Sequence, residues 1–308
     1  MNKKKKKSEM SLSLWQQIYY HKSSYFMIAP FVVLFTIFFI LPVIASLLLG
    51  FTYFDGVRMP KFIGLENYVT MFANDNVFII GLKNTMIMAI LTGPLSFILC
   101  FILAWLINEF PRRIRTVLTL VFFLPSLVGN AVIQMIQVIF HDDVRGYANS
   151  LLIYYKLIPE KILWFRDTKY NFILVVVIQI WMSLGAGFLT HIAGLQTIDP
   201  EIYEAGVIDG VKNRFQELFY ITYPMMKPFL FFSAVIQIAA AFNAGGIAIT
   251  LGGLPSNQWS LHTIISHIQY IGVTRFELGY ASAVSFVLTV IMIAVKSGIT
   301  KLFGSKAE

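Results

Sequence analysis

Long stretches without charged side chains alternate with short charged segments along the chain. An apolar helix needs about 20 residues to cross a bilayer, and six stretches approach or exceed that length. These uncharged stretches are residues 23–54, 84–108, 116–140, 170–198, 228–274 and 278–295. The fifth is too long for one helix, and Gly252-Gly253-Leu254-Pro255 interrupts its helical pattern, so we expect a span over residues 229–250 followed by an external loop. The pattern predicts an all-α membrane protein with six transmembrane helices.

The composition agrees with this reading. Apolar residues make up 57% of the 308 residues and charged residues only 13%. A soluble domain of this size has no core large enough to hide so much apolar surface. The surplus side chains must therefore face lipid.

The positions of the basic residues predict the orientation. The formal net charge is +8, which in a soluble protein would suggest a nucleic-acid partner, but in a membrane protein the distribution is more informative than the total. With a cytoplasmic N-terminus, 15 of the 24 Lys and Arg residues fall on inner segments, and the other nine are spread over longer outer loops. We therefore predict that both termini are cytoplasmic and that nucleic acid is not a partner.

Residues 1–22 form a basic tail before the first predicted span, so the six-span transmembrane domain is expected to cover residues 23–308. Within the tail, Trp15, Ile18 and Tyr19 alternate with polar residues, a pattern that suits a short helix lying among lipid headgroups. A disordered tail that only sets the topology is the alternative interpretation.

The chain lacks the motifs of an energy-coupling or catalytic protein. No Gly-rich loop ends in Gly-Lys-Ser or Gly-Lys-Thr, so we expect no nucleotide-hydrolysing site and no enzymatic activity. The five histidines show no metal-ligand spacing with Cys, Asp or Glu, and we expect His262 and His267 to be polar surface residues of an external loop. The predicted spans contain no Asp, Glu, Lys or Arg, whereas ion-driven carriers often place acidic or basic residues in mid-membrane. The expected catalytic and metal sites are therefore none.

Polar residues inside the predicted spans are amides and hydroxyls. They are Asn130, Gln134, Gln137, Gln179, Ser183, Gln237 and Asn243. An amide offers a donor and an acceptor without charge, which suits the hydroxyl groups of a sugar. Hydrogen bonding between helices is the competing explanation for each of these residues.

The segment between the fourth and fifth predicted spans looks like a short capped helix. Asp199 is a good N-cap, Pro200 fits the first helical position, and Gly210 can end the helix in a left-handed conformation. Ala205 and Gly206 are small, so such a helix could approach a partner protein closely.

This segment resembles the EAA loop of ABC importer permeases, which docks on the ATPase subunits. The matching residues are Glu204-Ala205-Gly206, Asp209-Gly210 and Ile221-Thr222-Tyr223-Pro224, within a loop at residues 194–228. Gly194-Leu195-Gln196-Thr197-Ile198 is similar to the carbohydrate-uptake branch, which includes the maltose permease, and further similarities run through the whole chain. Gly206 departs from the usual second alanine, and one extra residue lies among residues 211–214.

The resemblance implies a type I ABC importer permease fold in a bacterial inner membrane. It implies a carbohydrate permease subunit that forms half of a pathway with a second permease. Further implied partners are two ATPase subunits, which hold ATP and Mg²⁺ in place of any cofactor on this chain, and an extracellular solute-binding protein. The residues implied in ATPase docking are Glu204, Ala205, Gly206, Asp209 and Gly210, and those implied in the substrate pathway are Gln179, Ser183, Asn243, Gln237 and Gln134. A self-contained secondary carrier or channel is the alternative, but it leaves the loop around Glu204 unexplained.

Overall fold

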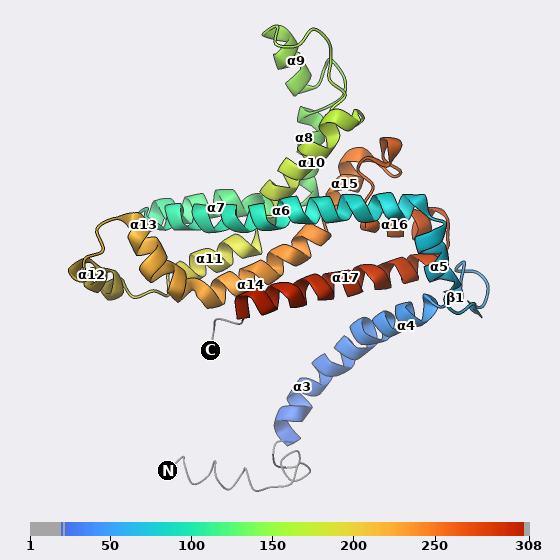
Figure 1. Cartoon of the computed structure of the whole chain (residues 1–308), viewed down its shortest axis with the longest axis horizontal. Helices are drawn as coiled ribbons and strands as arrows, with labels where there is room; N and C mark the ends of the chain where they lie inside the picture. Colours follow the sequence, from blue (N-terminus) through green and yellow to red (C-terminus); the bar gives the residue numbers. More distant parts are fainter. Residues whose placement is uncertain (1–19, 21, 305–308) are drawn as a thin grey trace.

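The computed structural model describes residue 20 and residues 22–304, and the fold is almost entirely helical (Figure 1). The predicted tail helix lies outside these residues, except for Tyr20 and Lys22. The long helices are α6 (Asn76–Asn108), α7 (Arg112–Val128), α10 (Thr168–Met182), α14 (Tyr223–Phe242) and α17 (Leu278–Gly304), preceded by α3 (Lys22–Phe35), a π-helical turn η1 (Thr36–Ile40) and α4 (Leu41–Leu49). The shorter elements are β1 (Thr52–Tyr53), β2 (Lys61–Phe62), α5 (Glu66–Ala73), α8 (Asn130–Ile139), α9 (Tyr147–Tyr154), α11 (Ala186–Leu195), α12 (Pro200–Ile208), α13 (Arg214–Glu217), η2 (Leu218–Thr222), α15 (Gly245–Gly252), η3 (Asn257–Trp259), α16 (Ile264–Gln269) and η4 (Tyr270–Thr274).

Helices long and apolar enough to cross a membrane account for the predicted spans. Among the described residues four qualify on their own, over Lys22–Leu49, Asn76–Asn108, Arg214–Gly252 and Leu278–Lys301. Two bent pairs, α7 with α8 and α10 with α11, bring the total to as many as six. A helix is the expected form, because it bonds its own backbone groups where no water can do so.

The third predicted span is a bent pair of helices, α7 and α8. The chain bends by 92° between α7 and α8. Gly129 lies at the bend with φ 58° and ψ −117°, a conformation that side-chain-bearing residues rarely adopt. The fourth span bends by 40° between α10 and α11, and the fifth changes from α14 to α15 at Asn243 and Ala244.

The bundle is held together by α6, which contacts α11 and α14 along its length. Figure 1 shows α6, α7, α14 and α17 running along the long axis, with α12 and α13 at one end and α5 and α16 at the other. The α4 helix packs on α17, whereas α3 extends away from the bundle (Figure 1), and the most apolar window of Lys22–Leu49 contains no buried residue. Its apolar surface is therefore available to lipid or to another protein.

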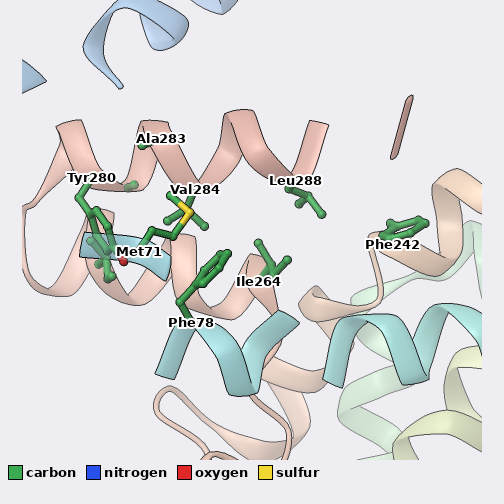
Figure 2. Packing of buried hydrophobic residues seen from close by; sticks show 10 residues of the cluster. Met71, Phe78, Phe242, Ile264, Tyr280, Ala283, Val284 and Leu288 are labelled. Carbon is green, nitrogen blue, oxygen red and sulfur yellow. The ribbon is translucent and has the colours of Figure 1, made fainter. Parts of the chain in front are cut away.

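One apolar cluster joins the first half of α17 to α5, to the start of α6 and to α16. Its central side chains are fully buried, and Figure 2 shows them facing one another between the helices: Met71, Phe78, Ile264 and Val284. Two similar clusters lie along α6, one with α8, α10 and α15, the other with α11 and α14. The α6 helix therefore contributes to every part of the core.

Glycine permits the close approach of α17 to residues 52–54. Asn67, which is only 8% exposed, donates hydrogen bonds to the carbonyl oxygens of Gly50 (2.9 Å) and Thr52 (3.0 Å) and fixes the chain at the β1–β2 pair. A Cβ atom added at Gly279 would collide with the Thr52 carbonyl oxygen. Because that neighbour is backbone, the contact cannot be relieved by a rotamer change.

Gly279→Ala should therefore destabilise the protein by about 1–3 kcal/mol, the usual cost of overpacking. Gly298→Ala is the matched control in the same helix, because a Cβ atom there meets nothing within 4 Å. Thermal unfolding of the purified protein in detergent measures both. Equal melting temperatures for the two variants would contradict the packing of α17 on residue 52.

Candidate functional site

The predicted capped helix between the fourth and fifth spans is present as α12. The Asp199 carboxylate accepts a hydrogen bond from the Glu201 backbone N–H at 3.0 Å, and Pro200 occupies the first turn. The helix ends at Ile208, and Gly210 takes a left-handed φ of 96° just beyond it. The sequence signals for both ends of this helix are confirmed.

One face of α12 packs on its own chain. The Tyr203 hydroxyl lies 3.2 Å from the Thr222 hydroxyl, and Gly206 is buried. A Cβ atom at Gly206 would collide with the Ile221 side chain. The small size of Gly206 is therefore explained by packing within this subunit, a role that the sequence reading did not assign to it.

The opposite face of α12 is uncovered. Val207 and Ile208 are 67% and 86% exposed, and Glu204, Ala205, Asp209 and Gly210 are also exposed. Two apolar side chains this exposed on a short helix at one end of the molecule are typical of a contact surface for another protein. Of the five predicted docking residues, four lie on this accessible side.

Arg214 connects the α12 loop to the bundle, and the sequence reading missed this role. Its guanidinium forms ion pairs with Glu109, just beyond the end of α6, and with Glu217 (2.9 Å) in α13. The turn that contains the extra residue is also ordered, since the Gln216 side chain accepts from Lys212 N (2.8 Å) and the Asn213 side chain accepts from Gln216 N (2.9 Å). Arg214 thus ties α13, the helix that follows the α12 loop, to the end of α6.

Three glutamines hold carbonyl groups that helix ends leave without partners. The Gln179 amide donates to Ala240 O at 3.3 Å, in the last turn of α14. The Gln237 amide donates to Ser183 O at 3.1 Å, at the end of α10. The Gln137 amide donates to Thr250 O in the last turn of α15. These bonds fit the interhelical explanation that the sequence left open, because unpaired carbonyls are costly in a membrane.

The predicted pathway residues divide by exposure. Gln179 and Gln237 are only 5% and 2% exposed. Ser183 is half-buried, and Asn243 and Gln134 are exposed. Asn243 and Ser183 stand at the breaks in the fifth and fourth spans, and Gln134 lies in the short helix after the break at Gly129. The structure thus brings polar groups to the interrupted part of three spans.

The loop histidines are buried, so the prediction that they are surface residues is wrong. His262 and His267 are 1% and 2% exposed. His262 Nε2 lies 3.1 Å from His267 Nδ1, and His267 Nε2 lies 3.0 Å from the Asp75 carboxylate, which also accepts from the Tyr280 hydroxyl at 2.8 Å. Asp75 is the N-cap of α6, accepting from Phe78 N at 2.8 Å. This chain of bonds joins the start of α6 to α16 and α17.

Burial controls the titration of this network. It lowers the pKa of His262 to about 4, with a further lowering by the neighbouring His267. Burial also lowers the pKa of His267, although the Asp75 carboxylate opposes that shift. At Asp75 burial acts to raise the pKa, but hydrogen bonds from Phe78, Tyr280 and His267 outweigh it, so the pKa lies below the usual value. Both histidines are therefore neutral at pH 7. No group of three or more His, Cys, Asp or Glu within the described part of the chain is placed to hold a metal ion.

Comparison with known proteins identifies relatives over nearly the whole chain. Residues 96–303 match the family described as the binding-protein-dependent transport system inner membrane component. The probable ABC transporter permease protein YesP of Bacillus subtilis is 33% identical over 275 residues, which is 88% of this chain and 86% of the relative. The arabinooligosaccharides transport system permease protein AraP of the same organism is 28% identical over 296 residues, covering 94% and 92% of the two chains.

A solved structure shares the fold. It is a chain of a bacterial ABC transporter involved in the import of the acidic polysaccharide alginate, with a TM-score of 0.81. Sequence identity is 22%, and the alignment covers 96% of this chain and 99% of the other. The predicted permease fold is therefore confirmed.

Acid should lower the stability that depends on the buried network of His262, His267 and Asp75. The unfolded chain takes up a proton on His262 near pH 6.5, but the folded chain does so only near pH 4. The stability that depends on neutral His262 is thus complete above pH 6.5 and is lost as the pH falls toward 4, by roughly 1–3 kcal/mol. We expect a lower melting temperature at about pH 5 than at about pH 7.5 in a thermal unfolding assay.

His262→Gln should reduce that pH dependence, because glutamine cannot titrate. His141→Gln provides the control, since His141 is exposed in the loop between α8 and α9. A pH dependence as steep in His262→Gln as in the parent would show that His262 is not the titrating group.

Proposed function

The chain belongs to the family of binding-protein-dependent transport system inner membrane components, and we propose that it serves as a permease subunit of an ATP-driven importer of carbohydrates. The observation that carries this proposal is α12, a capped helix with an uncovered apolar face at one end of the bundle. A self-contained carrier would have no use for such a surface. The relatives named for arabinooligosaccharide transport support an oligosaccharide as the substrate.

We assign α12 to the contact with two ATPase subunits, one for each permease. This chain then needs no nucleotide site of its own, and ATP and Mg²⁺ are bound by those subunits. Closure of the ATPases on ATP would move α12, and the Tyr203–Thr222 and Arg214–Glu109 contacts would transmit the movement to α14 and α6. The excess of Lys and Arg at this end supports a cytoplasmic position for α12 and for both termini.

The sugar pathway is proposed to run past the breaks in the third, fourth and fifth spans. Interrupted helices are a common way to expose polar groups at membrane depth, where they line a cavity. Asn243, Ser183 and Gln134 are the accessible polar groups of this region, whereas Gln179 and Gln237 are buried and mainly hold the helices together. A second, homologous permease would form the other half of the pathway.

Two further surfaces suit the remaining partners. The unburied apolar stretch Lys22–Leu49 is available to the second permease and to lipid. The end of the bundle opposite α12 carries α5, η3 and α16 (Figure 1) and would receive an extracellular solute-binding protein. Delivery of sugar at that end and ATP-driven movement at the other would give alternating access across the bacterial inner membrane.

Ile208→Glu should uncouple the importer. The side chain is 86% exposed in this subunit, so the change should not disturb folding, but it would bury an unpaired charge in the ATPase contact at a cost of several kcal/mol. We expect the variant to reach the membrane at parental levels and to lose both ATPase co-purification and sugar uptake.

Val57→Glu is the control, because Val57 is 91% exposed in the first outer loop. Gly206→Trp is a less informative choice, since the new side chain would collide with Ile221 inside this subunit. Parental uptake with the ATPase still bound to Ile208→Glu would refute the docking role of the exposed α12 face.

Asn243→Leu should weaken sugar binding while leaving the bundle stable. Loss of a matched amide leaves a sugar hydroxyl without its partner, a penalty of about 1–3 kcal/mol, which is roughly 5- to 150-fold in apparent affinity. Gln237→Leu should instead lower the melting temperature, because it removes the donor to Ser183 O. Uptake in vesicles and thermal unfolding separate the two effects, and unchanged uptake kinetics in Asn243→Leu would remove Asn243 from the pathway.

A further inference from the structure

A basic pocket lies at the end of the bundle that carries α12, outside the proposed sugar pathway. It has a volume of about 520 Å³ and is formed by the first half of α7 and the end of α11. The lining residues from α7 are Arg112, Arg115, Thr116, Thr119, Leu120 and Phe123. Ile192 and Gln196 close the other side. These α7 positions recur at intervals of one, three and four residues, so they share one helix face.

The arginines of this pocket have no acidic partner. Among the described residues, no ion pair includes Arg112, Arg113 or Arg115. Glu109, the acidic residue closest to them in sequence, pairs with Arg214 instead. Positive charge therefore gathers at the pocket without internal compensation.

Arg115 is already held in position. Its Nη1 donates to the Asn108 side chain at 2.8 Å, while its buried Nε atom has no hydrogen-bond partner. The guanidinium is only partly buried and has five N–H donors in all, so donors beyond the one given to Asn108 remain for an anion seated in the pocket. The Asn108 contact orients the guanidinium in advance, which lowers the entropic cost of binding.

The pocket changes from polar to apolar along α7. Its arginines stand in the first turn, the two threonines follow, and Leu120 and Phe123 lie deeper. From Arg112 to Phe123 the helix rises by about 16 Å. That order and length match a phospholipid, whose charged headgroup lies at the membrane surface and whose acyl chain extends inward.

We propose that this pocket binds an anionic phospholipid of the leaflet on the α12 side. Its phosphate would contact Arg112 and Arg115, and one acyl chain would lie against Leu120 and Phe123. A carboxylate-bearing sugar is the other anion that an importer could place here. The pathway side chains Asn243, Ser183 and Gln134 are uncharged, however, so an acidic sugar would find no counter-charge on its way through the membrane.

Such a lipid would stabilise the joint between α7 and α11 next to the loop that carries α12. The site is independent of the sugar pathway, so it can be tested without any transport measurement. The assembled transporter containing this subunit is placed in nanodiscs of phosphatidylcholine with a minor fraction of phosphatidylglycerol. Native mass spectrometry then counts the lipids that each complex retains.

The double variant Arg112→Gln/Arg115→Gln should reduce retained phosphatidylglycerol about tenfold, since charge-assisted hydrogen bonds to the phosphate are lost. Arg113→Gln is the control for each single variant, Arg112→Gln or Arg115→Gln, because it also removes one charge from the same turn but Arg113 does not line the pocket. Arg115→Lys should restore part of the retention because the charge returns. If the double variant fails to assemble, Leu120→Trp tests the acyl-chain portion with both arginines intact and should also reduce retention.

Three results would overturn the proposal. Equal loss of phosphatidylglycerol in Arg113→Gln would reduce the effect to general surface charge. Equal retention of phosphatidylcholine and phosphatidylglycerol by the parent would remove the preference for anionic lipid. Displacement of the lipid by a galacturonate oligosaccharide, but not by a neutral one, would make this an acidic-sugar site instead. These lipid measurements do not involve transport, so a failure of the proposed sugar pathway would be recognised separately from a failure of the lipid proposal.

Discussion

The need to bond every backbone carbonyl inside the membrane governs this structure. Continuous helices meet that need alone, but three spans of this subunit are interrupted, and each interruption frees carbonyl groups. Side-chain amides replace the missing bonds: Gln179 reaches α14, Gln237 reaches the end of α10, and Gln137 reaches α15. The same breaks leave Asn243 and Gln134 accessible. Stability and the accessible polar groups of the proposed sugar pathway thus come from one set of helix ends.

The two ends of the bundle are built by different chemistry. At the end that carries α5 and α16, Asp75 caps α6 and accepts hydrogen bonds from Tyr280 and His267, so burial and hydrogen bonds fix the start of α6. At the other end, the exposed Arg214 pairs with Glu109 and Glu217, and α12 presents apolar side chains to the surroundings. Ion pairs at an exposed site are weak and adjustable. A rigid receiving end and a more compliant driving end suit a subunit that is moved by a partner.

Sequence reasoning succeeded where one residue type has one strong local preference. The caps of α12 were predictable, because Asp199, Pro200 and Gly210 each act within a few residues of their own position. It failed where a residue's environment comes from distant segments. His262 and His267 are five residues apart in a polar-looking loop, yet Asp75, almost two hundred residues earlier, completes their network. Gly206 was read as a partner-facing residue, but Ile221 occupies the space beside it.

The sequence by itself determined the class of the protein, the number and approximate place of its spans, and the helix that carries the resemblance to importer permeases. Those features depend on apolar length, charge distribution and local caps, all of which can be read along the chain. Only the tertiary structure decided that the third span turns by 92° at Gly129, which amides are buried, and which face of α12 remains open. Such properties depend on what lies opposite each side chain. In a membrane helix both the lipid-facing and the packed face are apolar, so the sequence has no clear periodic pattern that distinguishes them.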